Sequence, residues 1–176
     1  MSRPLLFLDV DGPLNPYAAQ PERRPDGYTT LRVPRREPSL SRRPLRVWLN
    51  PAHGQALLRL GYELCWATTW MADANRWIAP VLGLPDLPFV DFGEALFRER
   101  PDGVHWKTAP LVEYAAGRPF AWVDDEQSGA DAAYVAAHHP GPRLLHHVNP
   151  RIGLRDADFR SLADFARSPI VSRPAD

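Results

Sequence analysis

The feature that most constrains the fold is a short apolar run, Leu5–Leu8, which ends abruptly at Asp9. A strand with one solvated face alternates apolar and polar residues, whereas this run is continuously apolar. It therefore predicts a strand that is buried on both faces. Strands of that kind are typical of parallel sheets covered by helices on both sides.

Further strand and helix patterns alternate along the chain. Expected strands cover 62–67, 120–123 and 143–148, with a short one at 89–90. Expected helices cover 51–60, 72–82, 106–116, 130–137 and 156–166, and Pro80 is expected to bend or end the second of them. Because strands and helices alternate, the strands should pair in parallel through right-handed crossovers. The prediction is an α/β protein with a doubly wound, mainly parallel sheet.

The segment 20–48 departs from this alternation. It is rich in Pro and Arg and holds two β-prone pieces, 28–33 and 45–48, which predict a projecting β-hairpin, or flap. Its arginines are Arg23, Arg24, Arg32, Arg35, Arg36, Arg42, Arg43 and Arg46. They could form a positive patch that binds a polyanion such as nucleic acid, or a solvated surface without a ligand.

The bulk properties of the 176 residues predict a single domain over 1–168, followed by a loose tail at 169–176. The formal net charge is zero, which gives no general argument for a nucleic-acid or membrane partner. No run approaches the roughly 18 apolar residues of a membrane-spanning helix, and the N-terminal run is too short for a signal peptide. Cys65 is the only cysteine and is expected to be buried and inert. We expect a soluble, cytoplasmic protein.

Polar side chains follow several of the predicted strands. In chain order they are Asp9 and Asp11, Thr68 and Thr69, the sole lysine Lys107, and Asp124 and Asp125. Because ligands bind at the carboxyl ends of parallel strands, we expect these groups to converge. Carboxylate oxygens suit Mg²⁺, and a hydroxyl and an ammonium group suit a phosphate.

The segment 5–12, an apolar strand followed by Asp-x-Asp-Gly, resembles the first motif of the haloacid dehalogenase superfamily. Ala67-Thr68, Lys107 and the segment 122–125 resemble its second, third and fourth motifs, in the required order. Within the superfamily, the segments 9–16, 67–70 and 122–125 are most similar to the phosphatase-like domain associated with Swiss Army Knife RNA repair proteins. Pro13, where many phosphatases carry Thr, is a departure from the pattern.

The resemblance implies a Mg²⁺-dependent phosphatase that acts through an aspartyl-phosphate. Asp9 would be the nucleophile, and Asp11 the general acid and base. Thr68 would bind a phosphate oxygen and Lys107 would neutralise charge. The Mg²⁺ ligands would be Asp9, Asp124, Asp125 and the backbone carbonyl of Asp11. Gly12, Thr69 and Trp70 are candidates for contacts with the substrate, and Thr69 could take the role of Thr68.

The segments 13–61 and 70–106 are too short to carry a separate cap domain. The resemblance is therefore to the capless type, whose open site serves large phosphorylated substrates such as protein side chains or nucleic-acid ends. Two other functions stay open: a catalytically idle domain that binds a phosphorylated partner, and a phosphotransferase with an acceptor other than water. The presence of Asp11 favours an enzyme, because a pure binder has no use for an acid/base group.

Each candidate also has a purely structural explanation. Lys107 could lie in a solvated first turn of a helix. Asp124 and Asp125 could cap the helix that follows them, and Thr68 could cap the helix after its strand. Burial and hydrogen-bond partners would distinguish these explanations from a shared site.

Overall fold

Four parallel strands form the central sheet, in the order β4-β1-β5-β6. They are β1 (Leu5–Leu8), β4 (Glu63–Trp66), β5 (Phe120–Asp124) and β6 (Arg143–His147). The computed structural model describes residues 3–34 and 43–168. The predicted α/β class with a mainly parallel sheet is confirmed, and the arrangement fits a Rossmann-like fold. The predicted tail at 169–176 lies outside the described residues.

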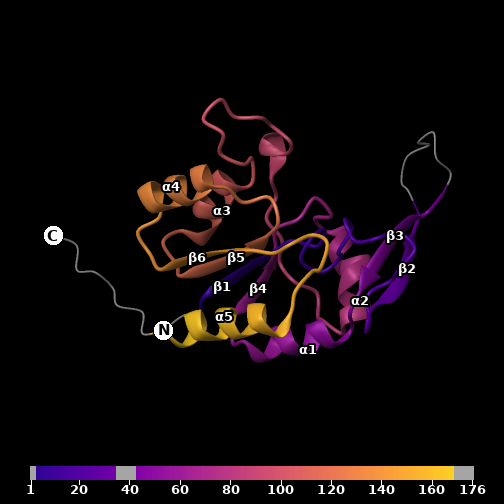
Figure 1. Ribbon diagram of the computed structural model, residues 1–176. Helices are drawn as coiled ribbons and strands as arrows, with labels where there is room; N and C mark the ends of the chain where they lie inside the picture. Colours follow the sequence, from indigo (N-terminus) through magenta and orange to yellow (C-terminus); the bar gives the residue numbers. More distant parts are fainter. Residues whose placement is uncertain (1–2, 35–42, 169–176) are drawn as a thin grey trace.

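Helices cover both faces of this sheet (Figure 1). On one side lie α1 (Ala52–Arg59) and α5 (Asp156–Arg167). On the other side lie α3 (Thr108–Ala115) and α4 (Gly129–His138). The helix boundaries differ from the predicted ones by one or two residues, as expected where helix ends fray.

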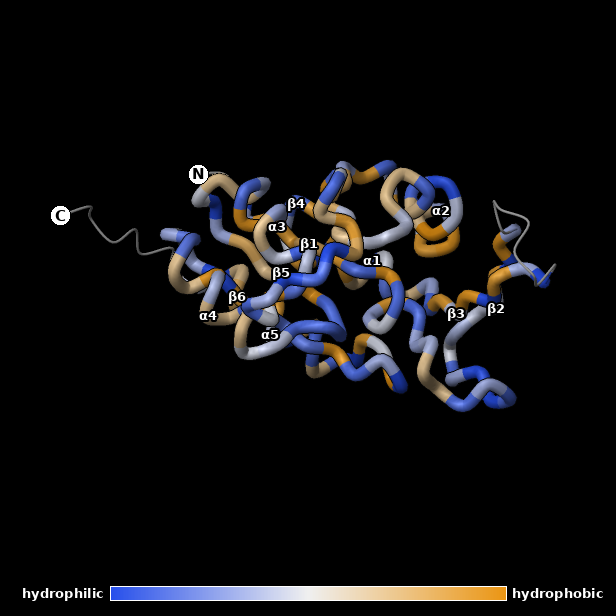
Figure 2. Tube along the Cα trace, turned by 90° about the horizontal axis from the view of Figure 1, so that it is seen from above, coloured by the Kyte–Doolittle hydropathy of each residue, from blue (hydrophilic) through white to orange (hydrophobic). Residues whose placement is uncertain are grey.

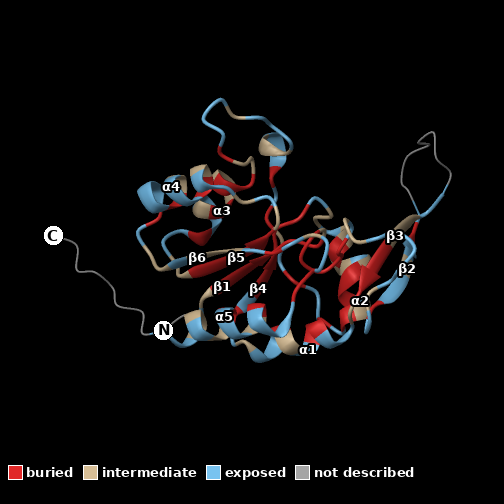
Figure 3. Ribbon diagram, viewed as in Figure 1, coloured by how far each residue is buried: buried red, intermediate tan, exposed pale blue. Residues whose placement is uncertain are grey.

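The position of β1 between two hydrophobic clusters explains why its sequence is continuously apolar. Leu6 and Leu8 pack in one hydrophobic cluster together with Leu57 of α1 and Leu162 of α5. Leu5 and Phe7 pack in the opposite cluster, with residues of α3 and α4. Successive side chains point to opposite faces, so each face of the strand serves a separate core. Figure 3 shows the buried strands lying between the two helix layers.

A second, two-stranded antiparallel sheet pairs β2 (Thr29–Val33) with β3 (Leu45–Leu49). Val33, Val47 and Leu49 are buried in the same cluster as the α1 side of the main sheet. The hairpin is therefore anchored to the main core along one side, and Figure 2 shows hydrophobic residues along β3 and at the neighbouring α2. Three of the flap arginines, Arg35, Arg36 and Arg42, lie outside the described residues.

The segment between β4 and α3 is less regular than predicted. The single helix expected at 72–82 is a π-helical turn, η1 (Ala74–Ile78), followed by α2 (Ala79–Leu82). Pro80 is the second residue of α2 and lies just after η1, where the helical turn changes type. The strand expected at 89–90 is reduced to one bridge between Trp66 and Phe89. A short 3-10 helix, η2 (Gly93–Ala95), was not predicted.

None of the helices in the described ranges is long and apolar enough to cross a membrane.

Candidate active site

Three aspartates meet at the carboxyl ends of β1 and β5. Asp9 directly follows β1, Asp124 ends the neighbouring β5, and Asp125 comes next in the chain. One carboxylate oxygen from each lies within 4.8 Å of the others. Asp9 and Asp124 are buried and Asp125 is partly exposed. The sheet thus gathers three oxygen donors that are far apart in the sequence.

Lys107 joins two of these aspartates. Its Nζ donates to Asp9 Oδ2 at 2.6 Å and to Asp124 Oδ2 at 2.8 Å. Only 1% of Lys107 is exposed, so the explanation of a solvated helical turn is wrong. Burial alone would lower the pKa of Lys107, but the charges of Asp9 and Asp124 together raise it, and the side chain remains an ammonium.

The remaining oxygens of Asp9 and Asp124 are also held. The backbone N–H of Val10 donates to Asp9 Oδ1 at 2.7 Å. Asp124 Oδ1 accepts from the Glu126 N–H at 2.9 Å, and Oδ2, which accepts from Lys107, also accepts from the Trp122 indole N–H at 3.1 Å. Neither carboxylate can turn without losing a hydrogen bond, so the site is fixed before any ligand arrives.

The cap of α4 is Ser128, not Asp124 or Asp125. The Ser128 side chain accepts from the N–H of Asp131, and Asp131 bonds back to the Ser128 N–H, which forms a capping box. The explanation of Asp124 and Asp125 as helix caps is therefore wrong.

Asp131 does more than cap α4. Its buried carboxylate also accepts from the N–H of His105 at 2.8 Å and from the Thr108 hydroxyl at 2.5 Å. Burial would raise the pKa of Asp131, but the hydrogen bonds from Thr108 and Ser128 hold it below its ordinary range. One carboxylate thus fixes the residues on both sides of Lys107. The sequence interpretation did not single out Asp131, although Ser-x-x-Asp before an apolar helix was a usable signal.

Asp11 lies apart from the three-aspartate cluster. Its Oδ1 accepts from Asn15 Nδ2 at 2.6 Å, and its Oδ2 accepts from the Trp70 indole N–H at 2.8 Å. Trp70 therefore positions Asp11. Since the carboxylate of Asp11 is outside the cluster, only its backbone carbonyl remains available as the predicted metal contact.

Gly12 has a structural reason for being glycine. Its φ is +95°, and a Cβ on it would collide with Oδ1 of Asp125. Any side chain at this position would displace Asp125, whose Oδ2 accepts from the Tyr17 hydroxyl at 3.1 Å. Gly12 was predicted to contact substrate, and the structure assigns it a role in placing Asp125.

These groups open into one cavity of about 370 Å³. Its floor holds Asp9, Asp11, Asn15, Lys107 and Asp125. Its sides hold Leu45 and Arg46 of the hairpin, Phe97 and Trp106 of the segment before α3, and Tyr17, Thr69 and Glu126. Among the predicted substrate contacts, Thr69 lines the cavity, whereas Gly12 and Trp70 stand behind its lining.

Thr68 and Thr69 take different positions. Thr68 is buried and its side chain is hydrogen-bonded to Asp9, which lowers the pKa of that carboxyl. The Thr68 hydroxyl also accepts from the Trp70 N–H at 3.4 Å, the bond expected of a cap. Thr69 is exposed on the cavity side. Thr69 can therefore donate to a ligand oxygen directly, whereas the single hydroxyl proton of Thr68 is committed to Asp9.

The electrostatics of the cavity are unfavourable for an anion on its own. Four carboxylates line it, from Asp9, Asp11, Asp125 and Glu126, against two cations, Arg46 and Lys107. Burial raises the pKa of Asp9 to about 7, even though Lys107 lowers it. Burial and then the charge of Asp124 raise the pKa of Asp125 to about 6. A divalent cation among these oxygens would offset much of the negative charge, and the all-oxygen donor set suits a hard ion such as Mg²⁺.

Comparison of the chain with protein-family models, with curated proteins and with solved structures found no match.

Proposed function

We propose that the protein is a Mg²⁺-dependent phosphatase of the haloacid dehalogenase type, which hydrolyses a phosphomonoester through an aspartyl-phosphate. The observation that carries this proposal is the buried Lys107 ammonium bonded to both Asp9 and Asp124 at the end of a parallel sheet. Burying a lysine with two carboxylates costs desolvation free energy, and buried ionisable groups of this kind cluster at functional sites.

Asp9, Asp124 and Asp125 would hold the ion, helped by the backbone carbonyl of Asp11. When bound, Mg²⁺ supplies the positive charge that allows an anionic phosphate to approach these carboxylates. Lys107 already holds part of this charge, since it remains an ammonium when buried. With Asp124 counted, five carboxylates face two side-chain cations and one divalent ion, so the ion would offset most of the negative charge.

Asp9 attacks phosphorus, and the bond from phosphorus to the leaving oxygen breaks. Asp9 suits this role because Val10 and Lys107 fix its two oxygens at the floor of the cavity. Lys107 and one of the two threonines stabilise the charge on the transferring group.

Asp11 delivers a proton to the leaving oxygen and later takes one from the water that cleaves the aspartyl-phosphate. It lines the cavity near Asp9 but outside the three-aspartate cluster. Asn15 and Trp70 orient it. Because the Asp11 carboxylate lies outside the cluster, it would be free to transfer protons while the three other aspartates hold the ion.

The substrate is a large phosphorylated molecule, with nucleic-acid ends as one class. The described residues between β1 and β4 hold the hairpin and α1, and those between β4 and β5 hold only short helices. No separate domain is present there to close over a small metabolite. The hairpin serves as a flap at one side of the cavity, where it contributes Arg46.

The test is a screen for phosphate release from nucleotides, phosphopeptides and 5′- or 3′-phosphorylated oligonucleotides, with Mg²⁺ and with EDTA. We expect hydrolysis that needs Mg²⁺ and is lost in Asp9→Asn. Tight binding without any release would instead support an idle binding domain. Transfer of label to an added alcohol, in preference to water, would support a phosphotransferase.

A further inference from the structure

One side of the cavity holds an aromatic ring that the proposed chemistry does not use. Phe97 is 68% exposed, more than any other large hydrophobic residue in the described part of the chain. Its φ is +58°, the left-handed region that bulky side chains avoid. A phenylalanine that is largely exposed and in an unfavourable backbone conformation contributes little to the core, and backbone strain of this kind is found at ligand-binding sites.

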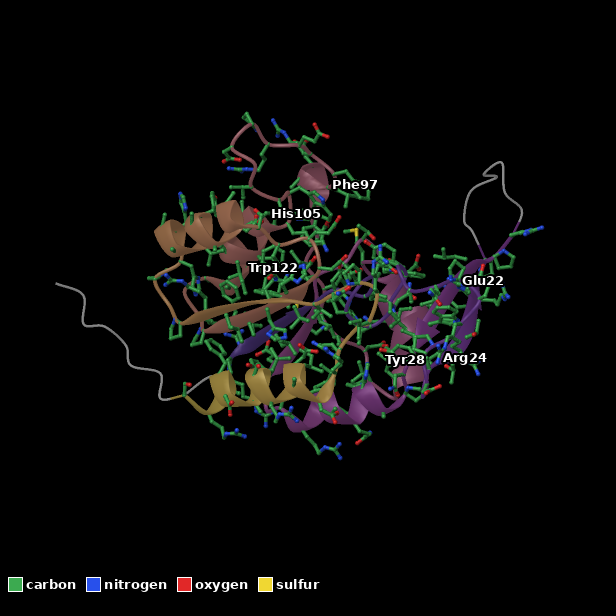
Figure 4. The ribbon with its side chains drawn as sticks, in the orientation of Figure 1. Glu22, Arg24, Tyr28, Phe97, His105 and Trp122 are labelled. Carbon is green, nitrogen blue, oxygen red and sulfur yellow. The ribbon has the colours of Figure 1, made fainter. Side chains whose placement is uncertain are left out.

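The ring of Phe97 is braced from behind. It packs on Trp106 with ring centroids 5.4 Å apart and tilted by 57°, and Trp106 in turn packs edge-on against Phe92 at 4.8 Å. Trp106 directly precedes Lys107 in the chain and lines the same cavity. Phe97 projects from the segment after η2 toward the side of the molecule that holds the hairpin (Figure 4).

The hairpin side of the cavity offers a fixed cation. The Arg46 guanidinium lies 3.9 Å above the Trp48 ring and donates to the Pro21 carbonyl at 2.6 Å. These two contacts restrain the side chain while the rest of the guanidinium fork remains available for an anion. Of the two cations that line the cavity, Lys107 is committed to Asp9 and Asp124, so Arg46 is suited to a second negative group.

We propose that the cavity is a nucleotide subsite: the leaving group carries a flat base that stacks on Phe97 and a second phosphate that pairs with Arg46. This inference rests on the proposed phosphatase function and adds the identity of the leaving group. A ring and two phosphates within one short unit are the chemistry of a nucleotide at the end of a strand, and a nucleoside bisphosphate is the smallest ligand that contains them. Base stacking on an aromatic side chain is tolerant of sequence, so the subsite favours nucleotides in general.

The proposal is tested by binding, which needs no turnover. The ligands are adenosine 3′,5′-bisphosphate, glycerol 1-phosphate, which lacks a ring, and a phosphotyrosine peptide, measured by calorimetry with the Asp9→Asn protein. We expect the bisphosphate to bind most tightly. Adding Phe97→Leu, which keeps an apolar side chain under the same backbone strain, should weaken its binding about tenfold. Phe97→Tyr should restore it.

Arg46→Gln should weaken binding of the bisphosphate more than binding of adenosine 5′-monophosphate, because only the former has the second phosphate. Arg160→Gln removes an exposed charge on α5, away from the cavity lining, and should leave both affinities unchanged. Circular dichroism and thermal unfolding confirm that each variant is folded.

The proposal is overturned if Phe97→Leu binds the bisphosphate as well as its parent does, or if the bisphosphate binds no better than glycerol 1-phosphate. Preference for the phosphotyrosine peptide would also overturn it and would identify a protein substrate. Failure of the phosphatase function shows differently. The wild-type protein would then release no phosphate with Mg²⁺ from any ester, whatever the outcome at Phe97 and Arg46.

Discussion

The floor and the sides of the cavity are built in different ways. The floor lies at strand ends: Asp9 directly follows β1, and Asp125 directly follows the adjacent β5. The carboxylates of Asp9 and Asp124 are buried and hydrogen-bonded. The sides come from the hairpin and from the segment 93–106, where Arg46 and Phe97 are partly or largely exposed. The floor is fixed by the same contacts that fix the fold, whereas the sides can change without disturbing the sheet. Under the proposed function, the floor would carry the chemistry and the sides would select the substrate.

The largest effect should follow from Asp9→Asn. The amide is nearly isosteric but cannot attack phosphorus, so kcat for any accepted ester should fall at least about a thousandfold. Asp86→Asn, which changes an exposed carboxylate outside the cavity, is the matched control and should be fully active. Normal turnover by a folded Asp9→Asn protein would show that Asp9 is not the nucleophile.

Asp11→Asn should lower kcat by about a hundredfold or more, because it deletes the proposed proton donor. Affinity for Mg²⁺ should change little, since the Asp11 carboxylate lies outside the three-aspartate cluster and its backbone carbonyl is retained. Asp125→Asn should do the reverse and weaken Mg²⁺ binding. Titration of both variants with Mg²⁺, monitored by calorimetry and by turnover, separates the two roles. Equal loss of Mg²⁺ affinity in both would contradict the division.

Lys107→Arg keeps the charge but should still reduce kcat/KM by about thirtyfold or more. The arginine side chain is longer and its guanidinium is planar, whereas the buried space between Asp9 and Asp124 fits a compact ammonium. Thermal unfolding must be measured alongside, because overpacking also destabilises. Wild-type kinetics in this variant would show that the floor tolerates a change in its cation.

The smallest effect concerns stability. The pKa of Asp9 is raised from the ordinary value of about 4 to about 7, so the folded state holds this proton at pH values where the unfolded chain has lost it. The folded state then binds more protons, and stability falls as pH rises through this window.

In EDTA, the Tm of the wild-type protein should therefore fall between pH 5 and pH 8 by roughly 3–8 °C more than the Tm of Asp9→Asn does. Mg²⁺ should restore wild-type stability at pH 8, because an ion bound only by the folded state raises Tm. Identical pH profiles for the two proteins would mean that Asp9 is not held in an unfavourable environment.

The sequence predicted the floor better than the sides, for a physical reason. Buried parallel strands have a strong local signature, and the rule that ligands bind at their carboxyl ends brought Asp9, Lys107 and Asp124 together correctly. The convergence of these groups is confirmed, whereas their catalytic roles remain predictions. Phe97 and Arg46 had no comparable signature. Which irregular segment lines a cavity depends on long-range packing, as in the contact of Trp106 with Phe97.

The regular elements were also predicted more accurately than the segment 70–106. There the local pattern indicated one helix, and the structure has a π-helical turn followed by a short α-helix. Periodicity in sequence does not distinguish these two kinds of helical turn, since Ala74 and Ile78 lie on a buried side in either case.

The contacts of Asp131 have a consequence for how the protein opens. Because one buried carboxylate ties Ser128, Thr108 and the backbone of His105 together, α4 cannot detach while the start of α3 stays in place. These segments should exchange their amide hydrogens as one cooperative unit, with a shared free energy of opening. Lys107 belongs to that unit and the hairpin does not. The cation at the floor of the cavity should therefore open together with α3 and α4, and independently of the hairpin.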